Sequence, residues 1–110
     1  ESVLDRMRIL AERLRVSGLL DSPVKRLSQG ERQRVAIGRA LLVRPGMILA
    51  DEPTGNLDPS GKQRIMDLLF DQADELGATL IVVTHDHALL DRFDRVVDFD
   101  RIGEREVDRV

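Results

Sequence analysis

Two adjacent acids and one histidine are the residues whose type and position are best suited to chemistry. Asp51 and Glu52 follow a short apolar run, and His85 follows a second apolar-rich run at residues 79–84. Removing a carboxylate from water costs on the order of several kcal/mol unless a partner compensates the charge. Hydrated Mg²⁺ is such a partner, because it takes one or two carboxylates together with substrate phosphates. We therefore expect Asp51 to hold the metal ion and Glu52 to orient or deprotonate a water molecule.

Each of these residues also has a purely structural interpretation. An Asp-Glu pair after a strand often only caps the following turn, and a single histidine is more often structural than functional. The context favours chemistry for the acids, because an apolar run precedes them and a histidine ends the next such run, where it could donate to a terminal phosphate or an attacking water. His87, by contrast, is expected to be solvent-exposed and to have no role.

Residues 28–31 form a third candidate group. Ser28 and Glu31 have the Ser-x-x-Glu spacing of a capping box, which as structure alone begins a helix. As chemistry, the backbone amides, the Ser28 hydroxyl and Gly30 would form an anion pocket at the positive end of that helix, since glycine lets the backbone approach a phosphate. Both interpretations stay open on these residues alone.

Two helices are predicted in the first half of the chain to position this turn. The first is amphipathic, with apolar residues at spacings of three and four, and Gly18 is expected to end it. The second begins at Ser28 and ends before Pro45, since proline does not continue a helix. The buried stripe of the first helix consists of Leu4, Met7, Leu10 and Leu14, and the inner face of the second of Val35, Ala36, Ala40 and Leu41.

A strand, a helix and a second strand are predicted in the second half. The runs 47–50 and 79–84 have the continuous apolar character of strands buried on both faces. Between them, Asp58 as N-cap and Pro59 as first residue begin a helix that Gly77 closes. A crossover of this length connects parallel strands, so both strands should end at one sheet edge, where open α/β sheets bind ligands. A short helix at 87–93 and a hairpin pairing 95–99 with 104–107 complete the prediction.

Taken in order, these segments resemble the motifs of the ATP-binding-cassette (ABC) ATPases. Residues 27–31, Leu-Ser-Gln-Gly-Glu, are similar to the signature motif, and residues 32–41 to the helix that follows it. Residues 47–52 resemble the Walker B strand with its catalytic glutamate, residues 56–58 the D-loop, and residues 84–86 the switch-histidine loop. The run 51–58 is similar to the branch of lipoprotein-releasing, macrolide-export and cell-division ATPases. Gln29 stands where glycine is common in the family.

The resemblance implies a P-loop NTPase fold, an α/β architecture with a parallel β-sheet core and flanking helices. Residues 1–45 would form part of the ABC helical subdomain, and residues 46–110 the C-terminal part of the ATPase core. ATP and Mg²⁺ would be the cofactors, and the ATP contacted by the signature motif would be held mainly by a second nucleotide-binding domain in a head-to-tail dimer. The residues implied in binding ATP are Ser28, Gln29, Gly30, Glu31 and Asp58, with Ser28 and Gly30 at the γ-phosphate.

For the reaction itself, the resemblance implies a role for each polar residue at the strand ends. Asp51 would support Mg²⁺, Glu52 would act as general base toward water, and His85 would steady the γ-phosphate. Asp58 would couple the two sites of the dimer. The implied function is ATP hydrolysis that drives a transmembrane permease, from a cytoplasmic position on the inner face of the cell membrane.

The phosphate-binding motif G-x-x-x-x-G-K-[ST] is not found in this sequence. The nearest imitation, Gly55 to Gln63, has five residues between its glycines, and its Lys62 falls inside a predicted helix. We therefore expect the chain to be the C-terminal portion of a nucleotide-binding domain that binds ATP poorly or not at all alone. Uncovered apolar side chains should leave it marginally stable or self-associating through its sheet edge.

Composition narrows the remaining alternatives. The chain has 17 basic and 20 acidic residues, a net charge of −3, and only three aromatic residues, all Phe, so we expect no nucleic-acid partner. The absence of cysteine excludes disulfides and thiolate metal sites. Two other functions stay open: a non-transport ABC ATPase of translation or DNA maintenance, and a catalytically silent interaction module.

Overall fold

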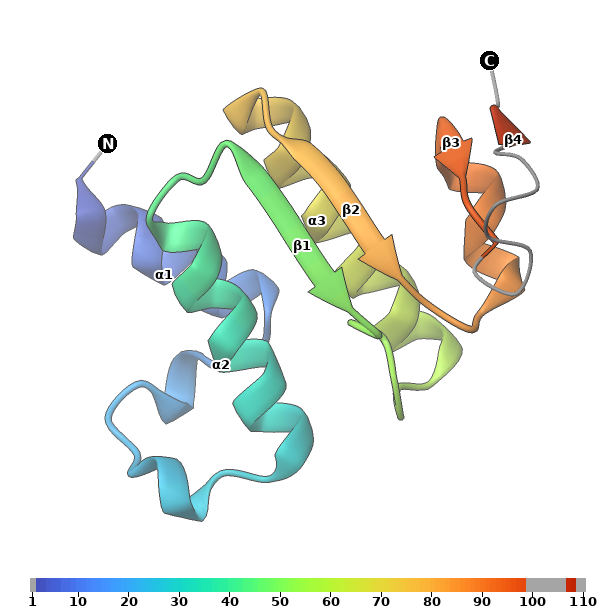
Figure 1. The fold of residues 1–110 in the computed structure, drawn as a ribbon. Helices are drawn as coiled ribbons and strands as arrows, with labels where there is room; N and C mark the ends of the chain where they lie inside the picture. The colour runs from blue at the N-terminus through green and yellow to red at the C-terminus, as the bar shows by residue number, and fades with distance from the viewer. Residues whose placement is uncertain (1, 99–106, 109–110) are drawn as a thin grey trace.

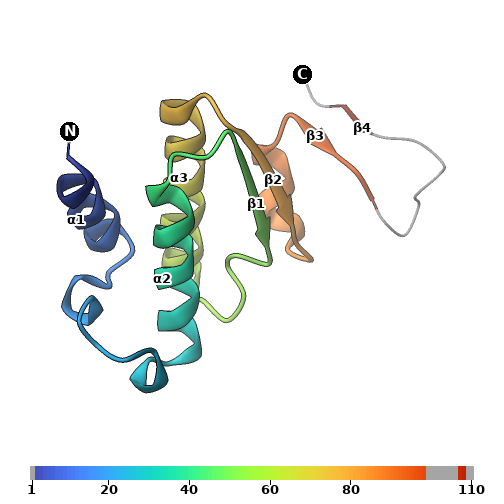
Figure 2. The ribbon, with the colours of Figure 1, turned by 60° about the vertical axis from the view of Figure 1, so that its left-hand side comes forward.

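A parallel pair of strands with a long helix on one face positions the residues of interest. In the computed structural model, which describes residues 2–98 and 107–108, strands β1 (Met47–Asp51) and β2 (Thr79–Val83) pair in parallel, with Met47 opposite Thr79 and Asp51 opposite Val83. Helix α3 (Pro59–Leu76) connects them and lies against one face of the pair (Figures 1 and 2). The predicted strand–helix–strand unit is therefore confirmed.

Helices α1 (Val3–Arg13) and α2 (Gln29–Leu42) pack on each other and lie on the α3 side of the sheet (Figure 2). Two short 3₁₀ turns, η1 (Ser17–Leu19) and η2 (Val24–Arg26), fill the connection between them. One continuous core joins the three helices to the sheet, and its most buried large side chains are Leu14, Leu41, Ile65, Met66, Leu68 and Leu69.

Three of the predicted helix ends are confirmed by their caps. The Ser28 hydroxyl accepts from the Glu31 amide at 3.1 Å, and the Glu31 carboxylate accepts from the Ser28 amide at 2.8 Å, which completes a capping box. Asp58 caps α3 by accepting from the Gly61 amide at 2.7 Å. Gly77 ends α3 with a φ of 64°, in the left-handed region that favours glycine.

The predicted end of the first helix is wrong. Helix α1 ends at Arg13, and Gly18 lies beyond it in η1. Arg15 adopts a φ of 58°, and the Val16 amide returns to the Ala11 carbonyl at 2.9 Å, which is the hydrogen bond of a Schellman motif. An arginine therefore takes the left-handed position that a glycine occupies more often.

The buried stripe of α1 also differs from the prediction, because it contains Arg6 and excludes Leu4. Leu4 is 59% exposed, whereas Arg6 is only 4% exposed. The Arg6 guanidinium donates to the Leu41 carbonyl at the end of α2 and to the Gln72 side chain on α3, both at 2.8 Å. A buried polar group needs such partners, and through these two hydrogen bonds Arg6 of α1 is linked to both α2 and α3.

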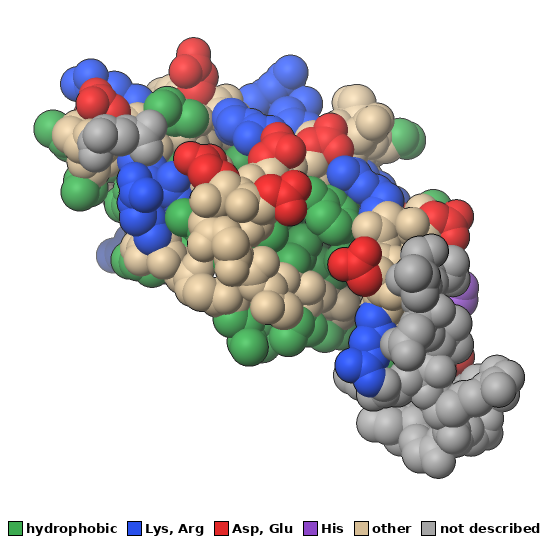
Figure 3. All heavy atoms as spheres, turned by 90° about the horizontal axis from the view of Figure 1, so that it is seen from above, with side chains coloured by type: hydrophobic (Ala, Val, Ile, Leu, Met, Phe, Trp, Pro, Cys, Tyr) green, Lys and Arg blue, Asp and Glu red, His purple; other side chains and the backbone are tan. Residues whose placement is uncertain are grey.

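The inner face of α2 and the burial of β1 both differ from the prediction. Leu41 is buried and Val35 half-buried, but Ala36 and Ala40 are exposed. In β1 the burial alternates, because Ile48 packs in the core while Met47 and Leu49 are 60% and 70% exposed on the other face. Seen from above, hydrophobic side chains protrude along the lower edge of the molecule, the side turned to the viewer in Figure 1 (Figure 3). Continuous apolar character predicts a strand buried on both faces, but among the described residues nothing buries the face of β1 that carries Met47 and Leu49.

The last elements follow β2. Residues His87–Arg92 form a 3₁₀ helix, η3, close to the predicted bounds. Strands β3 (Arg95–Val96) and β4 (Val107–Asp108) pair antiparallel, with Arg95 opposite Asp108. Strand β3 ends at Val96, although the prediction continued it through residues 97 and 98, and the predicted residues 99 and 104–106 and the expected turn at 101–103 lie outside the described residues.

Candidate active site

The end of β1 turns at Glu52 itself. The strand's hydrogen bonding continues to the Glu52 amide, which donates to the Val83 carbonyl at 2.7 Å. Glu52 then adopts a φ of 47°, a conformation that residues other than glycine, asparagine and aspartate rarely adopt. The Gly55 amide closes the turn on the Glu52 carbonyl at 3.2 Å. Such a conformation costs on the order of 1–3 kcal/mol and occurs most often at functional sites.

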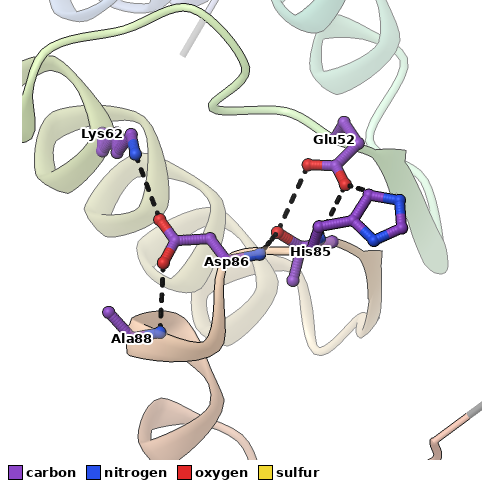
Figure 4. A network of polar contacts seen from close by, with 6 residues as sticks. Glu52, Lys62, His85, Asp86 and Ala88 are labelled. Carbon is purple, nitrogen blue, oxygen red and sulfur yellow. Dashed lines mark hydrogen bonds and ion pairs between the residues drawn. The ribbon is translucent and has the colours of Figure 1, made fainter.

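The strand end brings Glu52 and His85 together, as the parallel strand order predicted. The His85 amide donates to Glu52 Oε1 at 2.7 Å, and the Thr84 hydroxyl donates to Oε2 of the same carboxylate at 3.3 Å (Figure 4). The His85 imidazole lies beside it, with Nε2 3.7 Å from Glu52 Oε1, and this side chain is 99% exposed. Main-chain and hydroxyl donors therefore hold the carboxylate while the imidazole stays accessible.

Asp86 organises the loop that carries His85. Its amide donates to the Thr84 hydroxyl at 2.9 Å, and its Oδ1 accepts from the Ala88 amide at 3.0 Å, which caps η3. Oδ2 lies 3.2 Å from Lys62 Nζ of α3. The hydrogen bond from the Ala88 amide, followed by that from Lys62, lowers the pKa of Asp86 below its ordinary value. His87 is exposed, as predicted.

The turn at residues 28–31 is a complete capping box, and its outer side is open. Gln29 is exposed, and a methyl group added at Gly30 would meet only Arg34 Nη1, at 3.4 Å. The hydrogen bond from the Ser28 amide is the main cause that lowers the pKa of Glu31. Within the described residues, no hydrogen bond or ion pair joins the 28–31 turn to Glu52 or His85, so the structure does not bring these two predicted groups into contact.

Gln33 is the site residue that the sequence analysis did not single out. From α2, its Nε2 donates to the Glu52 carbonyl at 3.1 Å and to the Pro53 carbonyl at 3.0 Å. It therefore connects the helix that begins at the 28–31 turn to the turn that aims Glu52. Its spacing from Ser28 gave no signal, because a polar residue on a helix is usually assigned to the solvated face.

Asp58 and Asp51 lie on either side of the Glu52 turn. The Asp58 carboxylate is used as the cap of α3, where it accepts from Gly61 and from the Ser60 hydroxyl. Asp51, at the end of β1, is exposed, and its carboxylate makes no hydrogen bond or ion pair with any other described residue. A free carboxylate at this edge is thus available to a ligand.

The residues present fit Mg²⁺ held jointly with a nucleotide. Among residues 2–98 and 107–108, no group of three or more His, Cys, Asp or Glu side chains is arranged to bind a metal ion. Mg²⁺ does not require such a cage, since it keeps several waters and takes one or two carboxylates besides substrate phosphates. The unpaired Asp51 carboxylate is suited to that role.

The parallel strands joined by a helix, with polar residues at their carboxyl ends, have the α/β architecture that was predicted, that of a P-loop NTPase fold. The chain belongs to the ABC transporter family of ATPases. Its residues 2–55 match the family model described as ABC transporter. The described helices include none whose length and apolar character would let it cross a membrane.

Curated relatives cover most of this chain. The chain is 47% identical over 90 residues to the lipoprotein-releasing system ATP-binding protein LolD 1 of Caulobacter vibrioides. This alignment covers 82% of this chain and 38% of the relative. It is 48% identical over 97 residues to the macrolide export ATP-binding/permease protein MacB of Rhodopirellula baltica, covering 88% of this chain and 14% of that protein. The chain thus spans well under half the length of these relatives.

Solved structures show the same fold. The dimeric post-hydrolysis state of the ATP-binding cassette MJ0796, bound to ADP and Pi, superposes with a TM-score of 0.81 at 36% identity. The alignment covers 94% of this chain and 46% of that one. A second dimeric structure of MJ0796, described as a bacterial ABC transporter cassette, gives the same TM-score at 37% identity. The α/β fold predicted from the sequence is therefore confirmed.

Proposed function

We propose that the chain is the part of an ABC transporter ATPase that carries the signature motif, the Walker B acids and the switch histidine. Residues 1–45 would belong to the helical subdomain and residues 46–110 to the ATPase core. The observation that carries the proposal is the pairing of Glu52 with His85 at the carboxyl ends of two parallel strands. A carboxylate held by fixed donors beside an exposed imidazole suits hydrolysis of a phosphoanhydride.

In the proposed reaction, Glu52 accepts a proton from the water whose oxygen attacks the γ-phosphorus of ATP. The P–O bond to ADP breaks as the new bond forms, and phosphate leaves. The exposed His85 imidazole is free to donate to a γ-phosphate oxygen and so to offset charge that develops there. Asp51 would hold Mg²⁺, which when bound neutralises phosphate charge.

The 28–31 turn would act on a different nucleotide from the one at Glu52. This turn makes no hydrogen bond or ion pair with Glu52 or His85 among the described residues, and a Cβ added at Gly30 would meet only Arg34 Nη1. A head-to-tail dimer, consistent with the dimeric cassettes to which the chain is similar, would let Ser28, Gln29, Gly30 and Glu31 bind the ATP of a second cassette. Asp58 would lie between the two sites. The name of one relative, an ATP-binding/permease protein, supports coupling to a membrane permease. The chain would work at the cytoplasmic side of that permease.

The test is Glu52→Gln in the full-length protein. The amide keeps an oxygen that can accept from the His85 backbone, so the fold and ATP binding should persist while turnover falls by at least about 100-fold. Glu12→Gln is the matched control, because it makes the same chemical change at an exposed acid of α1. Unchanged turnover in Glu52→Gln would remove Glu52 from the role of general base. Calorimetry with Mg²⁺-ATP, if it showed no binding to the full-length protein, would favour the interaction module.

A further inference from the structure

Lys62 extends from the first turn of α3 to the loop that carries His85. Its Nζ lies 3.2 Å from Asp86 Oδ2, and the two side chains are 37% and 26% exposed (Figure 4). The sequence drew attention to this lysine only because Gly61-Lys62 imitates a phosphate-binding loop. The structure places it on a helix, with its ammonium group engaged by a carboxylate.

The contacts continue from Asp86 to Glu52 without a break. The Asp86 amide donates to the Thr84 hydroxyl at 2.9 Å, and that hydroxyl donates to Glu52 Oε2 at 3.3 Å. The other oxygen of Glu52 accepts from the His85 amide of the same loop at 2.7 Å. Both oxygens of the Glu52 carboxylate are therefore held by residues 84–85, and the position of that loop sets the position of the carboxylate.

Asp86 has two carboxylate oxygens with separate partners. Oδ1 accepts from the Ala88 amide within the loop, whereas Oδ2 reaches outside it to Lys62. Lys62 is therefore the side chain that ties this network to the body of α3, whose own start is fixed by the Asp58 cap. A salt bridge of this exposure contributes little to global stability, so its effect should be local.

We propose that Lys62 is a positioning residue for the hydrolytic site: by holding Asp86 it fixes residues 84–88, and through them the carboxylate of Glu52. This inference rests on the proposed function for its effect on turnover. The effect of Lys62 on the position of the loop does not depend on the proposed function, because it follows from the contacts alone.

A second ion pair between the same two elements provides a matched control. Asp67 of α3 and Arg92 of η3 lie 2.9 Å apart, with side-chain exposures of 46% and 37%. Arg92 also lies over the Phe70 ring, 4.5 Å from its centroid. Asp67→Asn therefore removes an ion pair of similar exposure between α3 and η3, and neither Asp67 nor Arg92 makes a hydrogen bond or ion pair with Glu52, Thr84 or His85 among the described residues.

The experiment compares Lys62→Met, Lys62→Arg, Asp86→Asn and Asp67→Asn in the full-length protein. Amide hydrogen exchange is measured over residues 84–88, and kcat and KM for ATP are measured in parallel. We expect exchange in this loop to be severalfold faster in Lys62→Met and Asp86→Asn, since asparagine still caps η3 but loses its charge. We also expect kcat to fall by about tenfold at unchanged KM, because a small displacement of a catalytic group is costly.

The controls decide between positioning and simple loss of an ion pair. Lys62→Arg should restore both readouts, Asp67→Asn should match the wild type, and the double variant Lys62→Met/Asp86→Asn should be no worse than either single change. Equal exchange in Lys62→Met and wild type would overturn the proposal, as would the same changes in Asp67→Asn. If the wild-type protein hydrolyses no ATP, the proposed function fails. In that case, faster exchange confined to Lys62→Met and Asp86→Asn would still support the inference that Lys62 and Asp86 restrain the loop.

Discussion

His85 contacts one oxygen of Glu52 in two ways. Its backbone amide donates to Oε1 at 2.7 Å, and its imidazole Nε2 lies 3.7 Å from that same oxygen. The amide contact belongs to the main chain and persists whichever way the side chain rotates. The imidazole, which is 99% exposed, is free to turn toward a ligand without releasing the carboxylate. The backbone of His85 therefore positions the Glu52 carboxylate, while the imidazole ring is available for contact with a ligand.

Gln33 provides the first prediction, because it ties α2 to the turn at Glu52. Gln33→Ala should lower the free energy of unfolding of the full-length protein by about 1–3 kcal/mol, since the Pro53 carbonyl loses its donor. Urea denaturation measures the change. Gln63→Ala, the same substitution at an exposed position of α3, should stay within about 0.5 kcal/mol of the wild type. Equal decreases in the free energy of unfolding in the two variants would contradict a stabilising role for the hydrogen bonds of Gln33.

Glu31 provides a prediction for pH. The hydrogen bond from the Ser28 amide lowers the pKa of Glu31, so its contribution to the start of α2 is fully present at neutral pH. Because the native pKa is the lower one, that contribution is lost as the pH falls through the acidic range below about 4. The protection of the Ser28 amide, which is its exchange rate compared with the intrinsic rate at the same pH, should therefore decrease at acidic pH. Glu31→Gln keeps a side-chain oxygen that can accept from the Ser28 amide but does not titrate. If the exchange of the Ser28 amide depended on pH in this variant as it does in the wild type, Glu31 would be ruled out as the cause.

Gly30 separates a ligand effect from a folding effect. A methyl group there would meet only a flexible arginine at 3.4 Å, so Gly30→Ala should fold normally and gain up to about 1 kcal/mol of helix stability. If this surface binds a phosphate, the same methyl group should reduce ATP turnover of the full-length protein by at least about tenfold. Gly18→Ala, at a glycine with open space around it, is the control. Full turnover in Gly30→Ala would show that the 28–31 turn contacts no nucleotide.

Local signals predicted the caps and the strand–helix–strand unit. The Ser28–Glu31 capping box, the Asp58 cap and Gly77 are each defined by a few neighbouring residues, and all are present. The meeting of Glu52 with His85 also followed from the sequence, because parallel strands joined by a crossover must end at the same edge.

Contacts between distant elements left no such signal. Arg6 reads as a polar residue between apolar positions, yet packing against Leu41 and Gln72 buries it. The left-handed φ of Glu52 comes from the turn that surrounds it and not from its side chain. The two-sided burial predicted for β1 is wrong for a related reason: apolar residues show that a face is suited to burial, but whether it is buried depends on what packs there.

The exposed face of β1 and β2 leads to the last prediction. Met47, Leu49 and Ile81 are 60%, 70% and 42% exposed, and burying a side chain of this kind is worth roughly 1.5–3 kcal/mol. Within the described residues, β1 has a strand on one side only, so its other edge also has unpaired backbone groups. The 110-residue chain on its own should therefore associate in a concentration-dependent way, as measured by sedimentation velocity. Leu49→Lys should shift it toward the monomer, whereas Ile9→Lys, at a 47% exposed position of α1 away from the sheet, should not. A monodisperse wild-type monomer with a sharp two-state melt would show that this face is stable in water.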